Sequence, residues 1–307
     1  MTKIKIPSHY LCDTDLSAEQ IEQVLNLSAE VKKNPEAFSS VLKNKTVALL
    51  FEKSSLRTKF TLQIGIQQMG GYSVINEGSI PDREPVKDIA RNLSRWADII
   101  VARVYSQTTL EQLAEHSLIP VVNALSNLYH PCQILADMLT LKEQFGKLRG
   151  LSLAFVGDGN NVANSLILSS ASLGLNFRIA TPKNYSPPLK IIKKAETLNL
   201  QSKGRLLVTN NIKQAVTGAD VIYTDTWVSM GQEAETKARL KIFKNYQVNE
   251  KLFTYAKPGG VFMHCLPRRP GQEVSDDVFE SPNSLVFEQA ENRLHTIKAL
   301  LAFLSNL

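Results

Sequence analysis

The strongest constraint on the fold is a series of short apolar runs, rich in β-branched residues and separated by helix-like segments. The first run is residues 46–51, and similar runs follow at 99–104, 151–156, 219–224 and 259–264. Runs of this length and composition are typical of strands buried on both faces. Strands that alternate with helices every 20 to 30 residues or so, roughly one βα unit each, form parallel sheets covered on both faces by helices. The sequence therefore predicts an α/β protein built from doubly wound parallel sheets.

Length and composition narrow the class of protein. The chain has 307 residues, of which 43% are hydrophobic and 21% are charged, which is enough for two domains with separate cores. No apolar run reaches the ~18 residues that a membrane span needs, and the first ten residues lack the apolar segment of a signal peptide. We therefore expect a cytoplasmic protein with no membrane partner.

Charge and cysteine content exclude two further classes. The net charge of +6 would suit a nucleic-acid partner, but the basic residues are dispersed and no aromatic residues are interleaved with them. The three cysteines, Cys12, Cys132 and Cys265, show no metal-like or redox-like spacing, and an odd number argues against a disulfide framework. We expect neither nucleic-acid binding nor a metal site.

The segment after the first strand has the outline of a phosphate site. Ser55 is a good N-cap for a helix over residues 56–69, which Gly70 ends. Backbone N–H groups at a helix N-terminus lack partners within the helix and attract anions. This one also carries the hydroxyl of Thr58 and the guanidinium of Arg57. By itself the pattern also fits an ordinary capped helix with solvated charges.

In parallel sheets, ligands bind beyond the carboxyl ends of the strands, so chemistry is expected in the loops that follow them. Arg103 ends the predicted strand 99–104, and His130 precedes Pro131 at the start of another helix. A helix N-terminus disfavours a protonated imidazole, so His130 would be a neutral donor to a carbonyl oxygen. Asp225 follows the strand 219–224, where its carboxylate could hold a substrate ammonium.

A glycine-containing turn at 157–161 raises the alternative of an NAD-dependent oxidoreductase. Val162 stands where the third glycine of a dinucleotide-binding turn should be, and the next strand ends in Ala180-Thr181-Pro182 without a carboxylate for the ribose. Both details count against this alternative.

Four separated motifs resemble those of ornithine carbamoyltransferases, in the same order and spacing. They are residues 51–58 (Phe-Glu-Lys-Ser-Ser-Leu-Arg-Thr), 130–133 (His-Pro-Cys-Gln), 229–231 (Ser-Met-Gly) and 264–268 (His-Cys-Leu-Pro-Arg). The resemblance extends from about Tyr10 to the C-terminal helix. It implies transfer of a carbamoyl group from carbamoyl phosphate to L-ornithine, giving citrulline and phosphate in arginine metabolism, with no cofactor and no metal.

The resemblance also implies roles for individual residues. The catalytic group would be Arg57, Arg103, His130 and Cys265. Carbamoyl phosphate would be bound by Ser55, Leu56, Arg57, Thr58, Arg103, His130, Gln133, Cys265, Leu266 and Arg293. L-Ornithine would be bound by Asn161, Asp225, Ser229 and Met230. The Leu266–Pro267 peptide bond would be cis, as is common in this superfamily.

Domain organisation and assembly follow from the same resemblance. A carbamoyl-phosphate-binding domain would comprise residues 1–133 plus 290–307, and an ornithine-binding domain would comprise residues 134–289, joined by bridging helices with a cleft between them. The family implies a homotrimer or a multiple of one. Whether the enzyme would make or break down arginine stays open.

Three positions depart from the family pattern. Leu56 replaces a threonine, Ser79 is nearest to an expected glutamine, and Asn127 replaces a common aspartate. An apolar residue at the Leu56 position also occurs in carbamoyltransferases for N-acylated ornithines, which makes an acylornithine the alternative substrate. The intact motif at 229–231 and Cys265 favour free ornithine.

Overall fold

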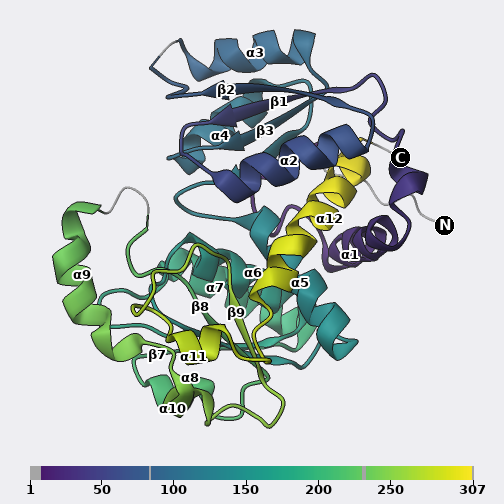
Figure 1. The fold of residues 1–307 in the computed structure, drawn as a ribbon. Coiled ribbons are helices and arrows are strands. Elements are labelled where there is room, and N and C mark those ends of the chain that lie inside the picture. The colour runs from purple at the N-terminus through teal and green to yellow at the C-terminus, as the bar shows by residue number, and fades with distance from the viewer. Residues whose placement is uncertain (1–7, 83, 230–232, 306–307) are drawn as a thin grey trace. The chain divides into compact units, whose positions relative to one another are not determined.

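The computed structural model describes residues 8–82, 84–229 and 233–305. The chain divides into two compact units, one made of residues 1–139 and 291–307 and the other of residues 140–290. These boundaries lie up to six residues from those expected from the sequence. Helix α5 (Pro131–Phe145) and helix α12 (Val286–Leu304) each contribute residues to both units. Figure 1 shows the ribbon of the chain with its elements labelled.

The first unit contains a four-stranded, all-parallel sheet in the order β2-β1-β3-β4. Its strands are β1 (Thr46–Phe51), β2 (Tyr72–Glu77), β3 (Ile99–Arg103) and β4 (Val121–Leu125). Its helices, besides parts of α5 and α12, are α1 (Ala18–Lys33), the 3-10 helix η1 (Pro35–Phe38), α2 (Leu56–Gln68), α3 (Val86–Trp96) and α4 (Gln107–His116).

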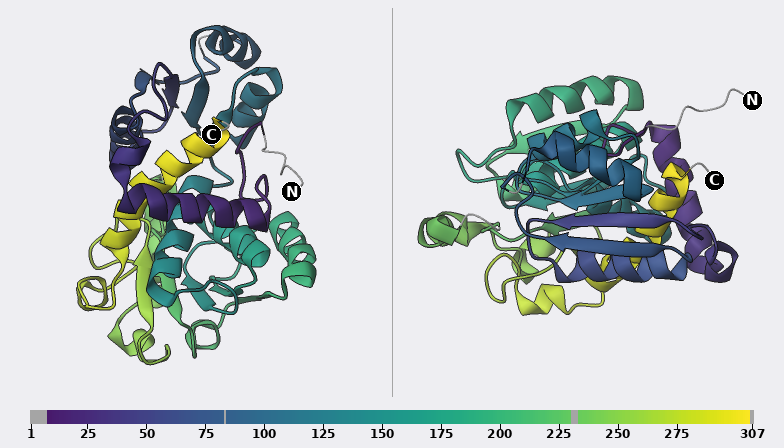
Figure 2. Two further views of the ribbon diagram at one scale, coloured as in Figure 1. Left: turned by 90° about the vertical axis from the view of Figure 1, so that its right-hand side faces the viewer. Right: turned by 90° about the horizontal axis from the view of Figure 1, so that it is seen from above.

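Helices cover both faces of this sheet. Alternate residues of β1, Ala48 and Leu50, form a buried cluster with Ala90 of α3 and Leu110 of α4, so these two helices share one face. Helix α2 lies on the opposite side of the strands from α3 (Figure 1). Both further views in Figure 2 show the yellow helix α12 beside the purple helix α1, where Lys32 donates to Asn292 (2.9 Å). The last segment of the chain thus completes the unit that the first segment begins.

The second unit contains a five-stranded, all-parallel sheet in the order β7-β6-β5-β8-β9. Its strands are β5 (Ser152–Val156), β6 (Asn176–Ala180), β7 (Arg205–Thr209), β8 (Val221–Thr224) and β9 (Val261–His264). Its helical segments are α6 (Asn161–Leu173), α7 (Leu189–Ser202), α8 (Ile212–Val216), η2 (Glu233–Glu235), α9 (Thr236–Phe243), η3 (Lys244–Tyr246), α10 (Glu250–Phe253) and α11 (Asp276–Phe279).

This sheet is also covered on both faces. Val156, Ile222 and Phe262, from three neighbouring strands, pack in one buried cluster with Val216 of α8 and Phe279 of α11. Helices α6 and α7 pack against each other and against strands β6 and β7. The two sheets confirm the expected fold class of doubly wound parallel α/β units. No helix in the described ranges is long and apolar enough to cross a membrane.

Local sequence signals account for many of the element ends. Ser17 and Gln20 form the reciprocal hydrogen bonds of a capping box at the start of α1. Pro131 begins α5, as its fixed φ and missing N–H favour. Gly174 ends α6 with a φ of 76°, a left-handed conformation that glycine adopts without a steric penalty.

Candidate active site

The N-terminus of helix α2 is built by the residues that follow strand β1. Ser55 is extended and its Oγ accepts a hydrogen bond from the Thr58 N–H (3.3 Å), so it caps the helix as expected. Leu56, the first helical residue, has a side chain that is 69% exposed, whereas Thr58 is buried. The other N–H groups of the first turn have no acceptor one helical turn earlier, which is the general condition for binding an anion.

The loops next to this helix are held by the carboxylate of Glu52. Its two oxygens accept hydrogen bonds from the N–H groups of Ile80 (2.9 Å) and Tyr105 (2.8 Å), in the loops that follow β2 and β3. The ammonium of Lys53 lies over the ring of Tyr105, 4.7 Å from its centroid. Three loops at the carboxyl edge of the sheet are therefore fixed to one another.

Arg293 of helix α12 joins two distant parts of the first unit. Its Nη2 donates to Thr58 Oγ1 (2.8 Å), and its Nη1 donates to Gln133 Oε1 (2.9 Å). The guanidinium side chain is only 6% exposed. The chain therefore brings the phosphate-like loop, the His130–Gln133 segment and the C-terminal helix together at one point.

His130 is buried beside a group of arginines. Burial holds its pKa well below the ordinary value, and nearby positive charges act in the same direction. Those charges belong to Arg293, Arg103 and Arg57. Arg103 ends strand β3, where it pairs in register with Phe51 of β1, and it is buried as well. His130 is thus a neutral imidazole, able to donate one hydrogen bond and accept another.

This group can bind and polarise a small phosphorylated compound. Three guanidinium groups and a helix N-terminus attract the phosphate group of such a compound, which is a dianion, while Thr58 and His130 supply neutral polar groups. Buried cations arranged in advance around an anion also stabilise negative charge that develops during a reaction. The geometry fits transfer of a group away from a phosphate.

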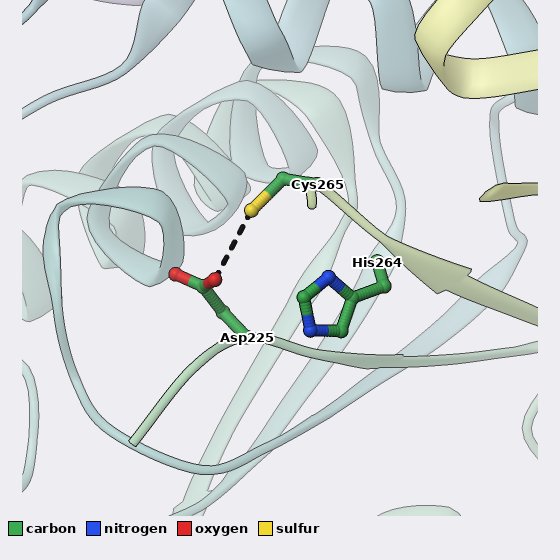
Figure 3. Close-up of side chains that lie close together, drawn as sticks. All are labelled: Asp225, His264 and Cys265. Atoms are coloured by element: carbon green, nitrogen blue, oxygen red, sulfur yellow. Dashed lines mark hydrogen bonds between the residues drawn. The ribbon is translucent and has the colours of Figure 1, made fainter. Parts of the chain in front are cut away.

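In the second unit, Asp225 is the centre of a smaller polar group (Figure 3). Its Oδ1 accepts from the thiol of Cys265 (Sγ to Oδ1 3.1 Å) and its Oδ2 accepts from the side chain of Asn160 (2.7 Å). Asn160 is also the N-cap of α6, because its Oδ1 accepts from the N–H groups of Val162 and Ala163. The loops after β5, β8 and β9 therefore meet at one buried carboxylate.

The loop after β9 is fixed from its other side by His264. The Nδ1 atom of His264 accepts the N–H of Leu266 (2.9 Å), and its Nε2 bonds to Glu273 (3.0 Å). Glu273 also accepts the N–H of Arg269 (2.7 Å), and both members of the pair are fully buried. These bonds hold Leu266 at a φ of 59°, beside the Leu266–Pro267 bond that is cis as expected.

Asp225, His264 and Cys265 lie close enough together to resemble a metal site. In Figure 3 the thiol points at the carboxylate, while the imidazole ring makes no bond to either group. The Nδ1 lone pair of His264 accepts the Leu266 N–H, so Nε2 carries the ring proton and donates to Glu273, and neither nitrogen is left to bind a metal ion. This arrangement favours a structural role for His264.

The turn after β5 is tightly packed. A Cβ atom on Gly159 would lie 2.4 Å from the backbone nitrogen of Pro187, so only glycine fits there. The side chain of Asn160 occupies the first N–H groups of helix α6. This packing leaves the turn without the open backbone that a dinucleotide pyrophosphate requires, which speaks against the NAD alternative.

A buried ion pair that the sequence analysis did not identify holds helix α9. Arg239 pairs with Asp158, and its Nε donates to the carbonyl of Trp227 (2.6 Å). The guanidinium also lies over the rings of Tyr185 (4.9 Å) and Phe243 (5.3 Å). Burial raises the pKa of Asp158 to about 6, although Arg239 opposes that shift. Arg239 therefore connects α9 to the loop after β5, which carries Asp158, and to the loop after β8, which carries Asp225 and Trp227.

Comparison with known proteins identifies the family. Residues 8–143 match the carbamoyl-P binding domain of aspartate/ornithine carbamoyltransferases, and residues 149–304 match their Asp/Orn binding domain. The chain belongs to the aspartate/ornithine carbamoyltransferase family. It is 47% identical over 298 residues to the ornithine carbamoyltransferase of Thermococcus kodakarensis, a match that covers 95% of this chain and 94% of that protein.

Solved structures in the family are similar throughout. The ornithine carbamoyltransferase of Pyrococcus furiosus has a TM-score of 0.94 at 43% identity, covering 97% of this chain and 96% of that one. An N-acetyl-L-ornithine transcarbamylase has a TM-score of 0.87 at 30% identity, covering 96% and 98%. The family thus includes structures named for both of the acceptors that the sequence analysis left open.

Some of the predicted site residues are hydrogen-bonded to one another in the first unit, and others belong to the second unit. Thr58, Gln133 and Arg293 are linked directly, while Ser55 and Leu56 begin the same helix. The other predicted members of this group are Arg57, Arg103 and His130; the positive charges of the two arginines help to lower the pKa of His130. Cys265 and Leu266, also assigned to carbamoyl phosphate, belong to the second unit.

The predicted ornithine residues are only partly described. Asp225 contacts Cys265, and Asn161 is the first residue of α6. Ser229 lies in the loop after β8, whereas Met230 falls outside the described residues. The residue that bonds to Asp225 is Asn160, one position before the predicted Asn161. An asparagine directly before a helix is a common N-cap, and that signal identifies Asn160.

Proposed function

We propose that the protein is an ornithine carbamoyltransferase, which transfers the carbamoyl group of carbamoyl phosphate to the δ-amino group of L-ornithine. The observation that carries the proposal is the cluster of Arg57, Arg103 and Arg293 around a neutral His130. This cluster lies in the region matching the family's carbamoyl-P binding domain, together with the C-terminal helix. The relatives named ornithine carbamoyltransferase support the choice of acceptor.

In the proposed mechanism the first unit binds and activates carbamoyl phosphate. The phosphate dianion binds the N-terminus of α2 through Ser55, the Leu56 N–H and Thr58, with Arg57 and Arg103 neutralising its charge. We assign five residues to the carbamoyl group: Gln133, His130, Arg293, Cys265 and Leu266. As the bond from carbon to the bridging oxygen breaks, the same arginines stabilise the departing phosphate.

The second unit binds the acceptor in this proposal. Asn161, Asp225, Ser229 and Met230 hold the amino-acid end of ornithine, and Cys265 orients its side chain. The neutral δ-amine attacks the carbonyl carbon, a C–N bond forms, phosphate leaves and the amine releases a proton. An unperturbed amine of this kind has a pKa of ~10.4 on the lysine analogy, so the rate rises with pH above neutrality.

Substrate comparison tests the proposed reaction. Citrulline formation from carbamoyl phosphate would be measured with L-ornithine, N-acetylornithine, putrescine and L-aspartate in parallel at pH 7 to 9. We expect turnover with L-ornithine alone. A folded protein that carbamoylates none of the four acceptors would contradict the proposal.

N-acetylornithine is the second candidate acceptor, favoured by the apolar Leu56 and by the structural match to an N-acetyl-L-ornithine transcarbamylase. Asp225 argues for free ornithine, because a buried carboxylate suits a substrate ammonium that acetylation removes. The variant D225N tests this contact. It should raise the KM for ornithine by about ten-fold or more if Asp225 meets the ammonium, and leave that KM unchanged if it does not.

We propose that the enzyme assembles as a homotrimer or a multiple of one. The first unit exposes apolar side chains at Leu56 (69%), Phe60 (54%) and Ile64 (41%), one turn apart along α2. The neighbouring edge strand β2 exposes Tyr72 (66%) and Val74 (63%) on one of its faces. Apolar surface of this extent is typical of contacts between copies.

Analytical ultracentrifugation measures the assembly directly. We expect a mass of three chains or a multiple of three, and a shift to smaller species when F60E places a charge on α2. A monomeric wild-type protein would contradict the proposed assembly. The cytoplasmic location stays a prediction from the sequence.

A further inference from the structure

The amide of Gln133 lies between a carboxylate and a guanidinium in the first unit. Its Nε2 donates to Asp137 Oδ1 (2.8 Å), and its Oε1 accepts from Arg293 Nη1 (2.9 Å). All three side chains are buried, with exposures of 1% for Gln133, 0% for Asp137 and 6% for Arg293. Gln133 and Asp137 are four residues apart on α5, so they lie on the same side of the helix.

These two partners fix which way the amide points. A carboxylate only accepts hydrogen bonds and a guanidinium only donates them. The NH₂ of Gln133 must therefore face Asp137, and its carbonyl oxygen must face Arg293. The opposite orientation would place two donors together at Arg293 and two acceptors together at Asp137, both buried away from water.

The orientation decides what Gln133 can offer to a ligand. Its carbonyl oxygen has two lone pairs, and Arg293 uses one of them. The arginines and the α2 N-terminus around it are hydrogen-bond donors. The Gln133 oxygen is therefore an acceptor in a largely donating site, suited to a ligand group that donates.

We propose that Asp137 is a positioning residue that determines specificity for an amino group on the phosphorylated substrate. It acts through Gln133, whose oxygen it keeps directed toward the ligand. Carbamoyl phosphate presents an NH₂ that can donate to this oxygen, whereas acetyl phosphate presents a methyl group that cannot. The inference rests on the proposed function, because it assigns the ligand's carbamoyl end to Gln133.

Two stable phosphonates test the inference without any turnover. Phosphonoacetamide carries an NH₂ beside its carbonyl, and 2-oxopropylphosphonate carries a methyl group in the same place. Titration calorimetry would measure their affinities, and that of inorganic phosphate, for the full-length wild-type protein, D137L and D137N. The variant D88L is a control for removing a carboxylate elsewhere in the same unit, since Asp88 is a half-exposed carboxylate on α3.

We expect the wild type to bind phosphonoacetamide about ten-fold or more tightly than 2-oxopropylphosphonate, the effect of one hydrogen bond made in a buried site. The leucine of D137L cannot accept a hydrogen bond from Gln133, so the preference of this variant for phosphonoacetamide should fall to about three-fold or less. D137N retains an acceptor oxygen and should keep most of the preference. Inorganic phosphate should bind the wild type, D137L and D88L within about two-fold of one another, because none of the changes touches a phosphate ligand.

A folded D137L protein with the wild-type preference would overturn the inference, as would an equal loss of affinity for all three ligands. If D137L does not fold, Q133M tests the same acceptor, and a retained preference in Q133M would also refute it. Failure of the proposed reaction looks different. In that case the wild type distinguishes the phosphonates but forms no citrulline with ornithine.

Discussion

Replacing Leu56 by threonine should strengthen the binding of carbamoyl phosphate. Leu56 is the first residue of α2 and its side chain is 69% exposed, so little apolar burial is lost in a single chain. Threonine is a slightly poorer helix former, at a cost of roughly 0.5 kcal/mol. A hydroxyl at this position can donate to a phosphate oxygen, and a hydrogen bond to a charged group contributes ~1.5–3 kcal/mol. The gain therefore exceeds the cost.

In kinetic terms, L56T should lower the KM for carbamoyl phosphate by about ten-fold, since ~1.4 kcal/mol corresponds to one factor of ten. The initial rate of citrulline formation would be measured against carbamoyl phosphate at saturating ornithine. Inhibition by inorganic phosphate gives an independent measure, and its inhibition constant should fall by a similar factor. The KM for ornithine should stay unchanged.

The variant F60T is the matched control. Phe60 is exposed on the same side of α2, one turn further on, so F60T removes apolar surface without placing a hydroxyl at the helix start. It should leave both phosphate constants unchanged. The reasoning is refuted if L56T folds and assembles like the wild type but binds carbamoyl phosphate no more tightly. An equal effect of F60T would refute it as well.

Three further predictions concern the second unit. R239M should lower the free energy of unfolding by about 3–5 kcal/mol, because it leaves Asp158 buried without its cationic partner, and denaturant unfolding of R239M/D158N should recover part of that loss. The pKa of Asp158 is raised to about 6, so the folded protein binds its proton before the unfolded chain does, and stability due to this group is lost as pH rises through 6. Between pH 4 and 7.5 the free energy of unfolding of the wild type should fall relative to that of D158N, by up to about 3 kcal/mol in total. Parallel curves of unfolding free energy against pH would contradict this prediction. C265A should raise the KM for ornithine by about ten-fold, whereas C265S keeps a donor to Asp225 and should raise it by about three-fold or less; equal effects of the two variants would count against a role for that bond.

The sequence predicted features that depend on neighbouring residues. The buried strands, the Ser55 cap and the start of α5 at Pro131 follow from short-range patterns, and the structure confirms them. The fold class follows in turn, because strands and helices that alternate in this way have few other ways to bury their apolar faces.

Short-range sequence patterns do not predict contacts between residues that are far apart in the chain. Thr58 and Arg293 are separated by 235 positions, and only the resemblance to a family placed them together. The sequence does not mark Asp137 as a buried residue, because an isolated carboxylate in a helix usually faces solvent. Its position among the apolar residues Leu135, Met138 and Leu139 was a usable clue, since a buried charge requires a partner.

Arg293 is also among the last residues of the first unit to be synthesised. The second unit is one continuous stretch, residues 140–290, whereas the first unit needs residues 291–307 to be complete. The ribosome therefore finishes both sheets before it adds the guanidinium that joins Thr58 to Gln133. A chain cut short before α12 would carry every strand of the two sheets and yet lack the hydrogen bonds from Arg293 to Thr58 and Gln133.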